Sequence, residues 1–348
     1  MSIGVFTFND GTNYGATYQM YALQQVLKRY DEKAEVVNYQ HEKKKNRVNI
    51  KKIAFLPIKL IKEYKFKKFR RKYIKFSKEK YDTNLIKKNP PKYDIYVTGS
   101  DQVWNPRTMS EDIRDVYFLN IGDEKTKRIS YAPSIGVQTL EKKDEDYINK
   151  RLKRLDYISI REETGKELIK NLTNKNVEVT LDPTLLLKKE DWMKIEKNNN
   201  IPKERYIFVY TIEPDEKVVN IINYIAKNRN MKIVHTGFLK KYNNETRKPF
   251  TSPNEFLSLI HNADLVLTNS FHGTVFSLIY QKDFFAFPRG EMNSRIKNLL
   301  EKVELKDRFI KDIEDIDNCS KIDYNKVLKC LNFQRDKSIK YIEEALGK

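Results

Sequence analysis

The chain is poor in cysteine and has no long run of apolar residues. Its two cysteines, Cys319 and Cys330, lie close together near the C-terminus. This usage predicts a reducing compartment and no disulfide framework. No run of 18 apolar residues occurs, so no transmembrane helix is expected. The N-terminal stretch "MSIGVFTFND" lacks the basic start and apolar segment of a signal peptide, so we expect a cytoplasmic protein.

Several common ligand-binding motifs are also missing. The sequence has no Gly-rich P-loop, no GxGxxG, no HExxH and no CxxC. These patterns hold phosphates, dinucleotides, zinc or redox disulfides in a fixed local geometry. The sequence therefore predicts no metal site and no bound cofactor.

Short strand-like runs alternate with helix-like ones along the 348 residues. Such alternation is typical of parallel sheets flanked by helices, and the length suits two domains. The polar stretch between Lys188 and Lys203 separates the two halves. We predict an α/β fold with two Rossmann-like, doubly wound domains facing across a cleft. Residues 1–188 would form the N-terminal domain, and residues 203–348 the C-terminal domain with its final helix.

Positive charge is concentrated in one segment. Residues 41–92 contain twenty Lys/Arg and four Asp/Glu, which gives +16 of the formal +19 of the chain. Apolar and aromatic residues are interleaved with these cations. Those that fall roughly along one side of a predicted helix are Ile58, Ile61, Phe66, Phe69, Tyr73 and Phe76. The segment reads as a basic helical insertion in the N-terminal domain. Its role is left open between a solvated face and an anionic membrane surface. Nucleic acid is not expected, because no nucleic-acid-binding motif accompanies the charge.

Polar residues follow the predicted strands at the points where those strands end. Loops at the carboxyl edge of a parallel sheet share one space, and ligands bind there. In the first half these residues are Asn13, Tyr14, Gly15, Asp101, Gln102, Trp104 and Arg161; in the second half they are Ser270, His272, Gly273, Arg289 and Arg295.

The stretch "TNSFHGTVFSLI" places Ser270 and His272 between a predicted strand and a predicted helix. A helix N-terminus offers free N–H donors and a positive dipole end, and guanidinium groups match phosphate or carboxylate. A histidine in that position can transfer protons near neutral pH. We therefore expect a site for a phosphate or carboxylate with a proton donor beside it.

Six motifs in order resemble the polysaccharide pyruvyl transferase family: "NYGATYQMYAL", "GSDQVWNP", "SYAPSIG", "SIREETG", "LDPTLLL" and "TNSFHGTVFSLI". The similarity runs from about residue 4 to residue 310, and the basic insertion is not part of it. The resemblance implies a fold like that of GT-B glycosyltransferases. It implies transfer of pyruvate from phosphoenolpyruvate (PEP) to a sugar as a ketal, in bacterial surface polysaccharide assembly.

The resemblance also suggests roles for the candidate residues. His272 would be the general acid, and Asp101 a candidate base for a sugar hydroxyl. The PEP side would hold Arg161, Ser270, Gly273, Arg289 and Arg295. The acceptor side would hold Asn13, Tyr14, Gly15, Gln102 and Trp104, with Trp104 as an aromatic platform for a sugar ring. PEP would be a co-substrate, and the acceptor a polysaccharide sugar or its lipid-linked precursor.

Two alternatives use the same features. One is a GT-B-type glycosyltransferase that binds the diphosphate of a nucleotide sugar in the same place. The other is a non-catalytic scaffold or membrane-surface protein built on this fold. The pyruvyl transferase would release phosphate from PEP, whereas the glycosyltransferase would release a nucleotide, so the released product distinguishes these two enzymes.

Overall fold

The computed structural model describes residues 1–40, 56–199, 201–289 and 293–348. Residues 41–55 of the basic insertion lie outside this set. The chain forms two compact units. The first comprises Met1–Val48, Arg70–Leu187 and Phe333–Lys348, and the second comprises Asn49–Phe69 and Lys188–Asn332. Among the described helices, none combines the length and apolarity that a membrane span needs.

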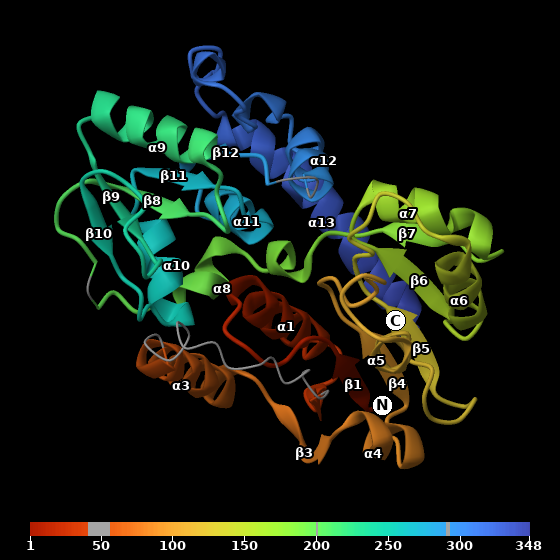
Figure 1. Ribbon diagram of the computed structural model, residues 1–348. Helices are drawn as coiled ribbons and strands as arrows, with labels where there is room; N and C mark the ends of the chain where they lie inside the picture. Colours follow the sequence, from red (N-terminus) through yellow and green to blue (C-terminus); the bar gives the residue numbers. More distant parts are fainter. Residues whose placement is uncertain (41–55, 200, 290–292) are drawn as a thin grey trace. The chain divides into compact units, whose positions relative to one another are not determined.

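The first unit is built on a seven-stranded parallel sheet (Figure 1). The strand order is β3-β2-β1-β4-β5-β6-β7, which is the Rossmann order extended by one strand. The strands are β1 (Ile3–Phe6), β2 (Glu35–Tyr39), β3 (Phe76–Tyr81), β4 (Ile95–Thr98), β5 (Lys127–Ser130), β6 (Tyr157–Ile160) and β7 (Val177–Val179). The central strands β1 and β4 are buried at every position. Their continuous apolar sequences follow from burial on both faces of a parallel sheet.

The described helices that accompany this sheet are α1 (Tyr14–Leu27), α4 (Thr83–Lys88), α5 (Glu111–Tyr117), α6 (Lys142–Leu152), α7 (Glu163–Ile169), η1 (Lys170–Leu172) and η2 (Pro183–Leu186). Helix α1 is buried along almost its whole length. It begins at Asn13, whose side chain accepts a hydrogen bond from the backbone N–H of Ala16 at 3.2 Å. This N-cap fixes the loop that follows β1.

The second unit is built on a five-stranded parallel sheet of order β10-β9-β8-β11-β12 (Figure 1). Its strands are β8 (Tyr206–Tyr210), β9 (Lys232–His235), β10 (Glu245–Arg247), β11 (Leu265–Thr268) and β12 (Asp283–Ala286). Its helices are α8 (Lys189–Met193), α9 (Glu216–Asn228), α10 (Pro253–His261), α11 (Phe271–Ile279), α12 (Ser294–Lys302), η3 (Lys306–Arg308) and η4 (Ile313–Ile316). The prediction of two Rossmann-like α/β domains is confirmed.

The last helix, α13 (Tyr324–Leu346), ends in the first unit and not in the C-terminal domain as predicted. Its hydrogen bonds give the reason. The hydroxyl of Tyr341 donates to the carbonyl of Ser130 at 2.8 Å. The backbone N–H of Leu181 donates to the hydroxyl of Ser338 at 3.0 Å. Both contacts are buried and fasten the end of the chain to the seven-stranded sheet.

The basic insertion is only partly helical. Helix α3 (Leu56–Tyr73) and the short α4 are present, but residues 76–81 form β3 and pair in parallel with β2. The unit boundary also falls within α3, after Phe69, so the helix is not simply an insertion in the N-terminal domain. The prediction of a helical insertion is therefore wrong at residues 76–81, where exposed side chains hide the strand pattern of β3.

Candidate functional site

The site of the second unit lies where the strand order of its sheet reverses. Strands β8 and β11 are parallel neighbours, and β9 and β12 extend the sheet in opposite directions from them. The chain leaves β8 at Thr211 and leaves β11 at Asn269. Loops at such a switch point diverge and open a crevice beyond the carboxyl ends of the strands. The "TNSFHG" stretch falls at this point.

Two polar side chains fasten this turn to the loop after β8. The hydroxyl of Thr268 donates to the carbonyl of Tyr210 at 2.6 Å and accepts from the backbone N–H of Ser270 at 3.0 Å. The side chain of Asn269 accepts from the N–H of Ile212 at 2.7 Å and donates to its carbonyl at 3.0 Å. The backbone around Ser270 is therefore held on both sides, and the start of α11 is pre-organised.

Ser270 is the N-cap of α11 and has extended backbone geometry. The first helical bond runs from the N–H of Thr274 to the carbonyl of Ser270 at 3.0 Å. His272 lies in the first turn, is 9 % exposed, and packs edge-on against the ring of Phe271 with the centroids 5.2 Å apart. The histidine therefore stands at the positive end of a helix, where an anion is stabilised.

Gly273 allows this helix to approach the strand closely. A Cβ atom at Gly273 would lie only 2.2 Å from the Oγ1 atom of Thr268. That hydroxyl already makes two of the four bonds that hold the turn. A larger residue at position 273 would therefore displace Thr268. The role of Gly273 in donor binding stays a prediction.

Tyr210 joins Ser270 and Arg289 in one cluster. Burial raises the pKa of the Tyr210 phenol to about 12, while a hydrogen bond with the Ser270 side chain and the charge of Arg289 act in the opposite direction. The Nη2 atom of Arg289 lies 3.7 Å from a carboxylate oxygen of Glu213, whose side chain is 89 % exposed. Sequence reasoning did not predict Tyr210 as a site residue, because a tyrosine at the end of an apolar strand has the pattern of a core residue.

Arg295 occupies the first turn of α12 and is half-buried. Its predicted role in PEP binding stays a prediction. Among the described residues, no group of three or more His, Cys, Asp or Glu side chains forms a candidate metal cluster.

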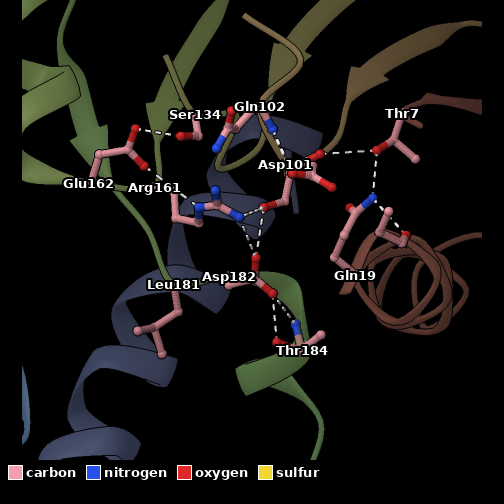
Figure 2. A network of polar contacts seen from close by, with 12 residues as sticks. Thr7, Gln19, Asp101, Gln102, Ser134, Arg161, Glu162, Leu181, Asp182 and Thr184 are labelled. Carbon is pink, nitrogen blue, oxygen red and sulfur yellow. Dashed lines mark hydrogen bonds and ion pairs between the residues drawn. The ribbon is translucent and has the colours of Figure 1, made fainter. Parts of the chain in front are cut away.

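Three of the site residues predicted in the first unit, Asp101, Gln102 and Arg161, lie in or beside a buried polar network (Figure 2). The Nη1 atom of Arg161 donates to Asp182 Oδ2 at 3.0 Å and to Ser100 Oγ at 3.3 Å. Its Nε atom lies 3.6 Å from Glu162 Oε2. The side chains of Arg161, Glu162 and Asp182 are 2 %, 5 % and 0 % exposed. Burial alone would lower the pKa of Arg161, but Asp182 and Glu162 outweigh it and raise that pKa above its ordinary value.

The two carboxylates extend the network across the strand ends. Asp182 accepts from the backbone N–H of Thr184 at 3.0 Å and from its hydroxyl at 2.6 Å. Glu162 accepts from the hydroxyl of Ser134 at 2.7 Å, and Figure 2 shows this bond beside the Arg161 guanidinium. Arg161 therefore joins the segments that follow β4, β5 and β7. Its assignment to PEP remains a prediction, and the structure places it in the first unit.

Asp101 is held in an unusual backbone conformation. Its φ is +84°, a region that residues other than glycine rarely adopt. Its carbonyl accepts from the N–H of Ser134 at 2.8 Å, and its carboxylate accepts from the N–H of Gln102 at 2.8 Å. The side chain of Gln102 in turn accepts from Asn105 at 2.9 Å. Strain of this kind tends to collect at functional sites, and both Asp101 and Gln102 are partly exposed.

Trp104 does not form a platform for a sugar. Its side chain is 0 % exposed and stacks on Phe118, with the ring centroids 4.5 Å apart and the planes 8° apart. Its indole N–H donates to the carbonyl of Tyr117 at 3.1 Å. The prediction is therefore wrong: Trp104 fills the core of the first unit. Of the other acceptor candidates, Tyr14 and Gly15 are buried in α1, and Asn13 is exposed at its N-cap.

The fold and these strand-end sites define a two-domain α/β protein of the GT-B-like class. Solved structures with this fold include the UDP-N-acetylglucosamine 2-epimerase of Rickettsia bellii, at TM-score 0.58 and 13 % identity, covering 99 % of this chain and 95 % of that one. The Neisseria meningitidis UDP-GlcNAc 2-epimerase, solved with UDP-GlcNAc bound, matches at TM-score 0.52 and 12 % identity, covering 99 % of both chains. No curated protein matches the chain.

The family model described as polysaccharide pyruvyl transferase matches residues 13–291. This range includes Asn13, the Arg161 network and the turn that carries His272. The chain belongs to the polysaccharide pyruvyl transferase family, and that family is one of transferases.

Proposed function

We propose that this protein transfers pyruvate from PEP to a sugar and forms a cyclic ketal on two of its hydroxyl groups. The observation that supports the proposal most directly is His272, which stands in the first turn of α11, inside the matched range. A substrate that carries phosphate and carboxylate groups suits a helix N-terminus with Arg289 nearby.

The reaction begins with proton transfer to the methylene carbon of PEP. His272 donates this proton, and the neighbouring carbon becomes an oxocarbenium-like electrophile. Two sugar hydroxyls then add to that carbon, and the bond to the phosphate oxygen breaks. One hydroxyl proton restores His272, and the other leaves with the phosphate. Ser270, Arg289 and the start of α11 stabilise the phosphate as its charge develops.

Arg295 and Arg161 are proposed as further PEP ligands, with Asn13, Asp101 and Gln102 on the acceptor side. We assign Asp101 to the removal of the second hydroxyl proton, which then passes to the departing phosphate. No metal or cofactor is invoked, because the arginines can neutralise PEP. We further propose that the acceptor is a lipid-linked sugar precursor at the cytoplasmic face of the cell membrane.

The runner-up is a glycosyltransferase that takes a nucleotide sugar. The fold of the solved epimerases is compatible with it, since one of them holds UDP-GlcNAc. The family match favours pyruvyl transfer, because it covers both halves of the chain.

The test is to incubate the protein with PEP and a panel of lipid-linked sugars, following phosphate release and the mass of the sugar. We expect stoichiometric phosphate and a gain of pyruvate minus water. His272→Gln should lower turnover by about 10²–10⁴-fold. The matched control is His261→Gln, which removes a histidine of α10 that stacks on Tyr280. The glycosyltransferase would be the better assignment if the protein released a nucleotide from a nucleotide sugar and released no phosphate from PEP.

A further inference from the structure

Helix α3, labelled in Figure 1, exposes both apolar and basic side chains along one of its sides. Positions three and four residues apart lie on the same side of a helix. On α3 this spacing collects eight exposed residues along one side: Pro57, Leu60, Ile61, Tyr64, Lys67, Lys68, Arg71 and Lys72. We call these eight residues the α3 face.

The α3 face has an apolar half and a basic half. Leu60, Ile61 and Tyr64 are 54 %, 43 % and 63 % exposed, which is high for large apolar side chains. The four cations follow in the next two turns. No acidic residue belongs to the face. Glu63 lies at its margin and pairs with Lys59 at 3.8 Å.

The opposite side of α3 holds the helix in place. Phe66 and Phe69 are 0 % and 2 % exposed, so they are core residues. The Nζ atom of Lys65 lies 3.2 Å from Glu255 Oε2. The guanidinium of Arg70 donates to the carbonyl of Gly11 at 2.7 Å. The expected alignment of Phe66 and Phe69 with Ile61 on one side is therefore wrong, and these phenylalanines cannot enter a membrane without loss of packing.

We infer that the α3 face docks the protein on an anionic lipid surface. Leu60, Ile61 and Tyr64 enter the interface between headgroups and acyl chains, and the four cations contact the headgroup charge. Each basic residue near such a surface strengthens binding by about fivefold. Insertion of the apolar half and charge attraction of the basic half are each weak, but together on one helix they give stable, reversible binding.

The apolar half of the α3 face favours lipid over nucleic acid, because two of its three large exposed side chains are aliphatic. Proteins that grip single strands use basic grooves lined with aromatic rings on which bases stack. Leu60 and Ile61 offer neither stacking nor hydrogen bonds to a phosphate chain, whereas acyl chains accept them. The purpose of docking rests on the proposed function, since a lipid-linked sugar is presented at that surface. Binding itself requires no substrate.

The test is co-sedimentation of the full chain with vesicles of phosphatidylcholine alone, or with about a third phosphatidylglycerol, at low and high salt. Binding should require the anionic lipid and fall as salt screens the charges. Reversing the charge of Lys67, Lys68, Arg71 and Lys72 to Glu should weaken binding by at least about a hundredfold. Changing Leu60, Ile61 and Tyr64 to Ser should weaken it by about tenfold or more.

The matched control reverses four exposed lysines on α13, namely Lys326, Lys329, Lys337 and Lys340, which changes the net charge by the same amount. Binding should be nearly unchanged in this variant. Equal loss in the α13 control would show attraction to the whole cationic protein and overturn the docking face. The docking face would also be overturned if the wild type did not bind anionic vesicles, or if the Ser variant bound them as well as the wild type does. Displacement of the protein from anionic vesicles by added RNA would overturn it too.

A soluble sugar acceptor separates this inference from the proposed function. The α3 variants should turn over such an acceptor at the wild-type rate, because they touch no residue of the site. Vesicle binding could follow the expected pattern while neither the wild type nor the variants release phosphate from PEP. In that case the docking face stands and the proposed reaction fails. Circular dichroism melting curves should show that each variant folds.

Discussion

The Nη1 atom of Arg161 lies 3.0 Å from Asp182 Oδ2, and both side chains are almost fully withdrawn from solvent. A buried charge pair of this kind has exchanged its hydration for a small set of fixed partners. Arg161 therefore links strand ends of the first unit whatever it does for a substrate. Glu162 and Ser100 are further partners of Arg161.

Asp182→Asn should lower the free energy of unfolding by about 3–5 kcal/mol, because it leaves the Arg161 charge partly uncompensated in the interior. Urea unfolding followed by tryptophan fluorescence measures the change. Glu167→Gln is the control, since Glu167 pairs with Lys170 at the surface and should cost less than about 1 kcal/mol. Equal midpoints for the two variants would mean that the buried pair adds no stability.

Gly273→Ala should destabilise the second unit by about 1–3 kcal/mol and lower the rate of the proposed pyruvyl transfer, because its methyl group would overlap Thr268. The displaced hydroxyl would lose its bonds to Tyr210 and Ser270. A double-mutant cycle tests the mechanism. In a Thr268→Ala background the same substitution should cost clearly less, and strictly additive effects in urea unfolding and turnover would place the damage elsewhere.

The central strands of both sheets could be predicted from the sequence, and two edge strands could not. Strands such as β4 and β11 are short, fully buried apolar runs between turn residues. Strands β3 and β10 lie at sheet edges, and most of their side chains face solvent. An edge strand with a polar sequence carries little hydrophobic pattern, so its pairing is fixed by the neighbouring strand.

The loops at the strand ends could be predicted better than the environment of the residues within them. Polar residues after buried strands marked the loops correctly, since strand ends share one edge of a sheet. Burial within those loops depends on distant partners: Trp104 stacks on Phe118, and Arg161 meets Asp182, 21 positions along the chain. The same limit applies to α13, whose bonds to the first unit involve residues over 150 positions away.

Glu213→Gln should tighten binding of PEP modestly, by about two- to threefold at low salt. Glu213 lies 3.7 Å from Arg289 and competes with an incoming anion for its guanidinium. The effect should fade at high salt, because the Glu213 side chain is exposed and screened. Calorimetry with PEP at two salt concentrations measures it. Weaker binding in the variant would make Glu213 a ligand-orienting residue and not a competitor.

The last prediction concerns a buried histidine of the second unit. His235 is 3 % exposed, and its Nδ1 atom accepts from the backbone N–H of Gly237 at 3.1 Å. The proton therefore sits on Nε2, which donates to Glu245 Oε2 at 3.1 Å. Burial lowers the pKa of His235 below its ordinary value of 6.5, despite the attraction of Glu245. The folded protein thus binds this proton less readily than the unfolded chain.

The free energy of unfolding should consequently fall as the pH drops below about 6.5, where the unfolded chain takes up the proton and the folded His235 resists it. The slope from this one group can reach at most about 1.4 kcal/mol per pH unit. His235→Gln should remove this contribution, so the variant should lose less stability than the wild type between pH 7.5 and pH 5.5. Urea unfolding at several pH values gives both slopes, and His261→Gln serves as the control. Identical slopes for the wild type and His235→Gln would show that His235 titrates as an ordinary histidine.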